Sequence, residues 1–230
     1  MNKTIAIVED EAAIRQNYTA ALSKQGYQVR AYANRAAAEA EFTRQLPDLV
    51  LLDIGLEDEF EGGFELCRAL RSRSATLPII FLTARDSDLD TISGLRLGAD
   101  DYLTKDISLA NLCARVGAFF RRLEALRRPQ APVEEITRGA LTLDMNRYRA
   151  RWRNHPIELS LTEFWIVHSL ALHPGHVKKR EQLMQAAHVV VDDATITSHV
   201  KRIRKKFAAV DPSFSAIESI YAMGYRWNEE

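Results

Sequence analysis

The chain has 230 residues, more than a single hydrophobic core usually holds, so two domains are expected. Its 31 basic and 31 acidic side chains cancel, but residues 1–123 carry 15 basic and 18 acidic groups while residues 124–230 carry 16 and 13, which permits a second half that binds a polyanion. No apolar run approaches the roughly 20 residues of a membrane span, and the start lacks a signal-peptide pattern. A cytoplasmic protein is therefore expected.

The first half alternates short apolar runs with segments of helical periodicity. The runs predict five strands, at residues 5–8, 27–32, 49–53, 78–83 and 101–105. The intervening segments predict five helices, at residues 12–25, 35–45, 64–73, 86–97 and 108–126. Such βα units with short connections predict an α/β fold, a doubly wound five-stranded parallel sheet of flavodoxin-like type covered by helices on both faces.

The second half follows a different pattern. Residues 124–135 contain two prolines and mixed charge and predict a linker. Beyond it, strands are predicted at 141–144, 147–152 and 157–159 with a turn at 153–156, helices at 162–172, 180–187 and 193–207, and a terminal hairpin at 215–227. A smaller α+β domain over residues 136–230 is expected, with the first domain at residues 1–123.

Polar side chains follow four of the predicted parallel strands. Glu9 and Asp10 end the first strand, Asp53 the third, Thr83 the fourth and Lys105 the fifth. The carboxyl ends of parallel strands meet at one edge of the sheet, where ligands bind. Carboxylate oxygens suit Mg²⁺, which keeps several waters and accepts phosphate oxygens, and a hydroxyl and an ammonium can hold a phosphoryl group beside it.

These residues and their neighbours resemble the receiver domain of bacterial two-component response regulators. The matching segments are Val-Glu-Asp-Glu at 8–11, Leu-Leu-Asp at 51–53, Leu-Thr-Ala-Arg at 82–85 and Gly-Ala-Asp-Asp-Tyr-Leu-Thr-Lys at 98–105. The resemblance implies that Asp53 accepts a phosphoryl group from the phosphohistidine of a sensor histidine kinase. It also implies that the cofactor Mg²⁺ is held by Glu9, Asp10, Asp53 and the Gly55 carbonyl, that Thr83 and Lys105 bind phosphoryl oxygens, and that Tyr102 reorients on activation.

Two positions depart from the family's usual sequence. Glu57 stands where a proline is usual, and the acidic loop at 57–63 is about two residues longer. Asp106 follows Lys105, where the family has a proline after a cis peptide. A cis bond before a residue other than proline costs about 2.5–4 kcal/mol, so a trans peptide is expected there.

The third helix of the second half combines an apolar stripe with a basic surface. Ile196, Val200, Ile203 and Phe207 recur at helical spacing and predict a core-facing side. Five cations occupy the remaining faces, at Lys201, Arg202, Arg204, Lys205 and Lys206. A charge run of this kind is more often a solvated helix face, but it also fits the major groove of DNA and the flanking phosphates.

The second half as a set resembles the winged-helix DNA-binding domain of the OmpR/PhoB class. The matching segments lie at 159–164, 173–177, 180–183, 199–206 and 224–226. The resemblance implies that the third helix enters the major groove and that the terminal hairpin, the wing, reaches the neighbouring minor groove. The implied DNA-binding residues are Thr195, Thr197, Ser198, Lys201, Arg202, Lys205 and Arg226. Ala194 stands where arginine is common, and Tyr221-Ala222 where arginine and glycine are usual in the wing.

The same class pairs its phosphorylated receivers through salt bridges, here implied for Asp100, Asp101, Arg115 and Arg122. The expected function is thus a DNA-binding transcription regulator, not an enzyme, that forms a homodimer on phosphorylation and binds promoter DNA with repeated half-sites. One alternative is a phosphorylation-independent transcription factor whose receiver is a dimerisation scaffold. A phosphatase-like enzyme is disfavoured because Gly55 stands where its general acid would be. Segments 53–56, 62–67 and 104–108 also resemble regulators of dedicated sortase systems.

Overall fold

The computed structural model describes residues 3–56, 59, 61–84, 97–125, 135–187 and 193–228, with only the backbone for 122–125 and 193–195. The chain divides into two compact units, Met1–Gly117 and Ala118–Glu230. The predicted linker at 124–135 lies mostly outside the described ranges, as does the predicted helix at 86–97. Among the described helices, none is both long and apolar enough to cross a membrane.

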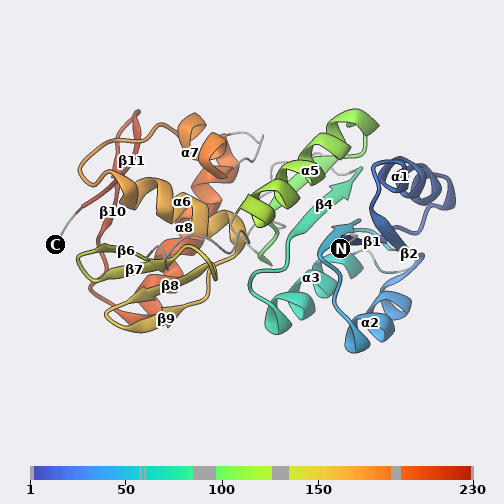
Figure 1. Ribbon diagram of the computed structural model, residues 1–230, viewed down its shortest axis with the longest axis horizontal. Coiled ribbons are helices and arrows are strands. Elements are labelled where there is room, and N and C mark those ends of the chain that lie inside the picture. Colours follow the sequence, from blue (N-terminus) through green and yellow to red (C-terminus); the bar gives the residue numbers. More distant parts are fainter. Residues whose placement is uncertain are drawn as a thin grey trace. The chain divides into compact units, whose positions relative to one another are not determined.

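The first unit is a parallel sheet in the strand order β2-β1-β3-β4-β5. Its strands are β1 (Thr4–Val8), β2 (Gln28–Tyr32), β3 (Leu49–Leu52), β4 (Ile79–Thr83) and β5 (Asp101–Thr104). Its helices are α1 (Ala12–Lys24), α2 (Arg35–Arg44), α3 (Gly62–Arg73) and α5 (Leu109–Ala125), whose last turns belong to the second unit. Figure 1 shows α1 and α5 on one face of the sheet and α2 and α3 on the other. The predicted doubly wound α/β fold is confirmed.

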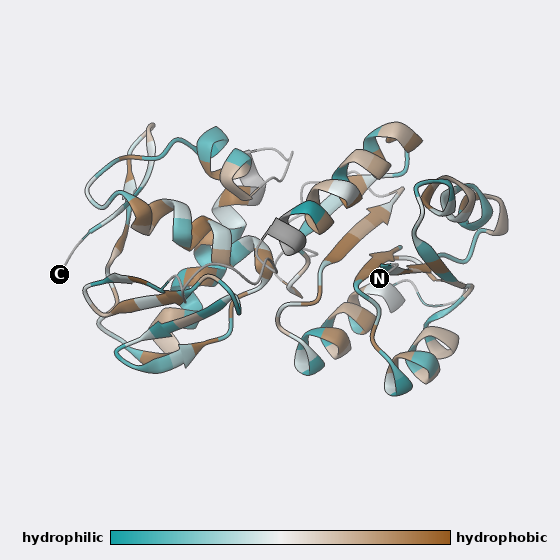
Figure 2. Cartoon of the chain, viewed as in Figure 1, coloured by the Kyte–Doolittle hydropathy of each residue, from teal (hydrophilic) through white to brown (hydrophobic). Residues whose placement is uncertain are grey.

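The order of the strands decides where the polar residues emerge. β3 and β4 are buried along their whole length, which explains the apolar residues that fill β3 and precede Thr83 in β4, and Figure 2 shows the body of β4 as hydrophobic. β1 pairs with β3 so that Val8 lies opposite Leu52. Glu9 and Asp53 therefore leave the sheet side by side, and the Asp53 N–H donates to the Val8 carbonyl at 2.9 Å.

The second unit is the predicted α+β module. A four-stranded antiparallel sheet runs β6 (Glu135–Arg138), β7 (Leu141–Asp144), β8 (Arg149–Trp152) and β9 (His155–Ile157). It is followed by α6 (Leu161–Leu172), α7 (Arg180–Ala187), α8 (Asp193–Val210) and the hairpin β10 (Ile217–Ile220) and β11 (Gly224–Trp227). These elements share one core, whose largest fully buried side chains are Trp152, Phe164, Phe207 and Trp227.

Two details of the sheet differ from the sequence-based expectation. β6 is an additional strand, and it begins at the last residue of the predicted linker. The predicted four-residue turn contains only Arg153 and Asn154, both with positive φ (48° and 69°), and Trp152 pairs directly with His155. Two consecutive positive φ values give the tight turn that matches the twist of a hairpin, so His155 and Pro156 belong to the strand.

Candidate functional site

Three carboxylates meet at the carboxyl edge of the parallel sheet. Glu9, Asp10 and Asp53 each offer an oxygen, and these oxygens all lie within 4.8 Å of one another. Glu9 and Asp53 are buried, at 2% and 6% exposure, while Asp10 is half-buried. Hard oxygen donors at this separation, with an excess of negative charge, fit a divalent cation such as Mg²⁺. The predicted convergence of these side chains is therefore observed in the structure.

Lys105 brings an ammonium group into the same site. Its Nζ lies 2.7 Å from Asp53 Oδ2 and 2.8 Å from Glu9 Oε1. The other oxygen of Asp53, Oδ1, accepts the N–H of Ile54 at 2.7 Å, so the carboxylate has a fixed orientation. Charge-assisted hydrogen bonds of this kind are strong and directional.

Burial and charge act on these groups in opposite directions. Burial raises the pKa of Glu9 to about 7, the negative charge of Asp53 acts the same way, and Lys105 opposes both. Burial alone would lower the pKa of Lys105, but its hydrogen bonds to Asp53 and Glu9 raise it instead. Lys105 thus stays an ammonium. The Glu9 carboxylate, in contrast, can bind or release a proton according to what binds beside it.

Two residues that hold this site were not singled out from the sequence. The Arg15 guanidinium, on α1, donates from Nη1 to the carbonyls of Glu9 at 2.6 Å and Asp10 at 2.8 Å, which fixes the acidic turn. Gly63, near the start of α3, approaches so closely that a Cβ there would lie 2.0 Å from the Asp53 carbonyl oxygen. Two sequence signals could have indicated them. Arg15 stands one turn into the helix that follows the acidic pair, and Gly63 belongs to a glycine pair after the acidic loop.

The loop after β5 presents Lys105 without a proline. No cis peptide occurs among the described residues, so the expected trans bond before Asp106 is confirmed. Asp106 accepts a hydrogen bond from the Thr104 hydroxyl, and the Ile107 N–H donates to the Thr104 carbonyl at 3.1 Å, which closes a turn. These two hydrogen bonds define the loop that follows β5 in the absence of the proline.

The remaining receiver residues have these places. Thr83 is buried at the end of β4, and its carbonyl accepts the Lys105 N–H at 2.8 Å. Tyr102 is buried, with its ring centroid 6.1 Å from that of Phe81. The carboxylate of Glu59, in the acidic loop, is held by Arg35, with Nε 2.6 Å from Oε2. Gly55 is half-buried two residues beyond Asp53.

Three of the residues implied in receiver pairing, Asp100, Asp101 and Arg115, form ion pairs within the first unit. Asp100 is fully buried and forms an ion pair with Arg71, and its Oδ2 also accepts the Ile79 N–H at 3.1 Å. Asp101 is buried as well, with Arg115 Nη1 2.9 Å from its Oδ2, and burial raises the pKa of Asp101 to about 6 against the effect of Arg115. The Arg122 side chain lies outside the described residues. Asp100 is thus an internal group and not a surface one.

In the second unit, α8 buries the predicted stripe. Ile196, Val200, Ile203 and Phe207 are all at most 1% exposed. The expectation that all five cations occupy the surface is wrong for Arg202, which is only 9% exposed. Lys201 and Lys205 are exposed, and within the described chain neither forms an ion pair. Thr197 is exposed and Ser198 is buried, while the Thr195 side chain is not among those described.

A buried carboxylate on α6 explains the position of Arg202. Glu163 is 0% exposed, with Oε1 2.6 Å from Arg202 Nε and Oε2 2.6 Å from Lys206 Nζ. Oε2 also accepts the Ser160 N–H at 2.7 Å, which completes a capping box at the start of α6. Burial raises the pKa of Glu163, but the charges of Arg202 and Lys206 outweigh it and lower the pKa to about 2. Glu163 therefore fixes α8 against α6.

The hairpin is bound to α8 by polar contacts. Arg204 donates from Nη2 to the Ile217 carbonyl at 2.7 Å and to Ser219 Oγ at 3.0 Å. The Tyr225 hydroxyl donates to Thr197 Oγ1 at 3.3 Å. Arg226, one of the residues implied in DNA binding, is half-buried and forms an ion pair with Glu218.

Two family models match the two units. The response regulator receiver domain matches residues 5–117, and the C-terminal domain of transcriptional regulatory proteins matches residues 154–227. Among curated proteins, the transcriptional regulatory protein CreB of Escherichia coli is 35% identical over 97% of this chain and 96% of its own. The phosphate regulon transcriptional regulatory protein PhoB of E. coli is 34% identical over 99% of each chain.

Solved structures agree with these matches. The response regulator DrrB, a Thermotoga maritima OmpR/PhoB homologue, is 27% identical over 99% of this chain and all of its own, with a TM-score of 0.51. A mutant of RitR, at 21% identity and a TM-score of 0.77 over the whole of both chains, shows the fold alone. None of these comparisons bears on the resemblance to sortase-associated regulators. A receiver unit followed by this DNA-binding unit, with such relatives over its full length, places the chain in the OmpR/PhoB class of two-component response regulators, which are DNA-binding regulators of transcription.

Proposed function

We propose that Asp53 is the residue on which this response regulator is phosphorylated. The phosphorus–nitrogen bond of a kinase phosphohistidine breaks as an Asp53 oxygen bonds to phosphorus, and the histidine nitrogen keeps the electron pair. Glu9, Asp10, Asp53 and the Gly55 carbonyl would hold Mg²⁺, which supplies positive charge to the phosphoryl oxygens. Lys105 supplies a second positive charge, and Thr83 a hydroxyl.

The contact of Lys105 with both Asp53 and Glu9 carries this proposal. One ammonium lies 2.7 Å and 2.8 Å from two buried carboxylates that also share a candidate cation site with Asp10. When a phosphoryl group joins Asp53, Lys105 can keep its position and exchange a carboxylate oxygen for a phosphoryl oxygen. Preorganised charge of this kind is most of what phosphoryl transfer requires from a protein.

Intact-mass spectrometry with a small-molecule phosphodonor tests the assignment. The full chain in Mg²⁺ is expected to gain one phosphoryl group, and Asp53→Asn to gain none. Asp48→Asn is the matched control, because Asp48 precedes the opposite end of the same strand, and it should be labelled like the wild type. Labelling of Asp53→Asn to the wild-type extent would contradict the proposal.

The same experiment separates the alternative in which the receiver is a dimerisation scaffold that is never phosphorylated. That alternative rests on Asp106 and the acidic loop, yet Asp106 leaves Lys105 in contact with Asp53. We propose that the chain accepts its phosphoryl group and at most slowly hydrolyses it, without turnover of another substrate. Its partners would be a sensor histidine kinase and a second copy of the chain.

For the output step, we propose that phosphorylation, through Thr83 and Tyr102, favours a symmetric receiver dimer to which Arg115 and Arg122 contribute. Two DNA-binding units would then bind adjacent half-sites with a raised effective concentration. Thr195, Thr197, Lys201 and Lys205 are the proposed α8 contacts. Sedimentation of phosphorylated and unphosphorylated protein tests the dimer, and an unchanged mass would argue against it.

A further inference from the structure

The outer face of the β6–β9 sheet carries exposed arginines at a regular interval. In β8, Arg149 and Arg151 are exposed and alternate with Ala150 and Trp152, which are buried. Successive side chains of a strand point to opposite sides of the sheet. Because Ala150 and Trp152 belong to the core of the unit, Arg149 and Arg151 point to the other side, towards solvent. We call this pair the β8 arginines.

The β8 arginines have no counter-ion within the part of the chain that the structure describes. Asp144 of β7 is in register with Arg149, but its Oδ1 accepts the Arg147 N–H at 2.9 Å and its Oδ2 is 3.7 Å from Arg147 Nη1. Arg153, just after β8, forms an ion pair with Asp211. The side chains of the β8 arginines, in contrast, form neither a hydrogen bond nor an ion pair with any described residue.

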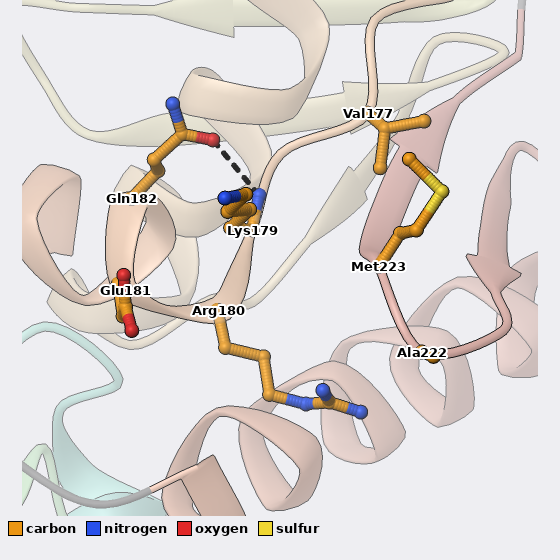
Figure 3. A pocket seen from close by; sticks show the side chains of 7 residues that line it. All are labelled: Val177, Lys179, Arg180, Glu181, Gln182, Ala222 and Met223. Carbon is orange, nitrogen blue, oxygen red and sulfur yellow. Dashed lines mark hydrogen bonds between the residues drawn. The ribbon is translucent and has the colours of Figure 1, made fainter.

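Other arginines of the second unit contact a neighbouring element instead. Arg180 of α7 lies over the Tyr225 ring, 5.9 Å from its centroid, and Figure 3 shows this side chain extending away from Gln182. Arg226 of β11 forms an ion pair with Glu218 of β10. These guanidinium groups hold the unit together. The β8 arginines have no such role, so their charge is available to a partner.

The interval between the β8 arginines fits an extended acidic segment. Side chains two residues apart on a strand are about 6.5 Å apart. An extended polypeptide repeats the side chains of one face at the same interval, so carboxylates at every second position can each meet one guanidinium. A guanidinium binds a carboxylate through two parallel N–H···O hydrogen bonds, which gives such a pair a defined geometry.

A nucleic acid fits this face less well. The inner face of β8 meets α8 in the core, where the Trp152 and Phe207 ring centroids are 5.7 Å apart. The β8 arginines therefore point away from α8 and from the duplex proposed to bind that helix. Proteins that bind single strands stack the bases on aromatic side chains, whereas the neighbours of Arg151 across the sheet are Thr142 and Pro156.

We propose that the outer face of the β6–β9 sheet is a docking surface for an acidic protein segment, which binds in an extended conformation over the β8 arginines. The surface lies outside the acidic edge of the first unit and outside the proposed α8 contacts. A partner docked here would leave both sites accessible and would be carried to promoter DNA with the regulator.

The test is an NMR titration of the ¹⁵N-labelled full chain with a short peptide in which glutamate and threonine alternate. The amide signals of β7, β8 and β9 should shift, and those of α8 should not. A peptide with glutamine in place of glutamate is the control ligand and should cause no shift, because its side chains carry no charge.

Two double variants locate the contact. Arg149→Thr with Arg151→Thr, which keeps residues suited to a strand, should weaken peptide binding roughly tenfold, the effect of two exposed charge pairs. It should leave the affinity for a DNA duplex selected from a random pool unchanged. Lys201→Ala with Lys205→Ala removes the same charge from the opposite side of the unit and should do the reverse.

Equal peptide affinity in the wild type and the Arg149/Arg151 variant would overturn the proposal. A similar loss of peptide binding in both double variants would overturn it too, since the peptide would then respond to net charge and not to this face. DNA binding that is weakened in the Arg149/Arg151 variant while peptide binding is intact would assign the face to nucleic acid instead. Tryptophan fluorescence of each variant verifies that the unit is folded.

Discussion

Glu9 in the first unit and Glu163 in the second are glutamates of nearly equal burial, 2% and 0% exposed. Glu9 shares Lys105 with Asp53 and lies beside Asp10, and burial raises its pKa to about 7. Burial acts on Glu163 in the same direction, but two cations and a backbone N–H bring its pKa down to about 2. The partners of a buried carboxylate, and not its depth, decide whether it stays charged.

The difference matches what each unit does. At the sheet edge, carboxylates outnumber the ammonium that meets them, so the site gains free energy when a cation arrives. Around Glu163 the cations are in excess and every carboxylate oxygen is used, so that site is complete without a ligand. Glu9 thus belongs to a site that can still take up a cation, and Glu163 holds two helices together.

The largest effect expected is the loss of Glu163. Glu163→Ala leaves Arg202 buried without its counter-ion and should destabilise the second unit by about 3–5 kcal/mol. Urea unfolding followed by tryptophan fluorescence measures it, because all three tryptophans, at 152, 165 and 227, lie in this unit. Glu181→Ala, an exposed glutamate in α7, is the control and should change the free energy of unfolding by at most about 0.5 kcal/mol.

Acid should act on the two units in opposite directions. The pKa of Glu9 is raised in the folded state, so folded Glu9 binds a proton more readily than unfolded Glu9 does. Without a divalent cation, in EDTA, the free energy of unfolding of the first unit should therefore fall as pH rises from about 4.5 to about 7, by up to about 3 kcal/mol. The pKa of Glu163 is lowered in the folded state, so Glu163 stabilises the second unit fully above about pH 4.5. This stabilisation is lost as the pH falls towards about 2.

Hydrogen exchange of the β1 and β3 amides reports on the first unit, and tryptophan fluorescence on the second. Glu9→Gln should flatten the response of the first unit between pH 4.5 and 7, since the titrating group is removed. A response in Glu9→Gln identical to that of the wild type would assign the pH dependence to other groups.

Mg²⁺ should stabilise the first unit and leave the stability of the second unit unchanged. At a concentration 100-fold above its dissociation constant it should stabilise the first unit by about 2.7 kcal/mol, whereas the second unit should not respond. Asp10→Asn should weaken or remove the effect, because one of the three carboxylates is lost. Thermal unfolding with and without Mg²⁺ measures both units, and an equal rise in the second would contradict the localisation.

The smallest expected effect is a change in the salt dependence of DNA binding. It compares the exposed cations of α8 with Lys206, which forms an ion pair with Glu163. Lys201→Ala and Lys205→Ala should each make the salt slope of DNA binding shallower by about 0.9, because each would remove a proposed phosphate contact. Lys206→Ala should leave the slope unchanged, since Glu163 already pairs this ammonium. Equal changes in all three variants would show that the Glu163 pair opens on DNA.

The sheet and its acidic edge could be predicted from the sequence because both follow from local patterns. Unbroken apolar runs predict buried parallel strands, and the residue after each run must then emerge at one edge, which brings Glu9 and Asp53 together. The apolar stripe of α8 is local in the same sense, since helical spacing alone defines it.

The environment of Arg202 and Asp100 could not be predicted in this way. Arg202 follows Lys201 in a run of cations, and nothing nearby in the chain distinguishes the two. Its partner Glu163 lies 39 residues away, and Arg71 lies 29 residues from Asp100. Whether a charged side chain is buried depends on a partner from another helix or strand. The periodic pattern of residues within one element does not indicate such a partner.

Gly63 limits how the first unit can change. Helix starts are commonly stabilised by replacing glycine with alanine, which reduces the freedom of the unfolded chain. Here the added methyl group would overlap the carbonyl of Asp53 at 2.0 Å, and the Gly63 N–H already donates to Ile54 at 2.9 Å. A side chain at position 63 would therefore push the Asp53 backbone away, so this end of α3 cannot be stabilised by alanine without disturbing the residue proposed to be phosphorylated.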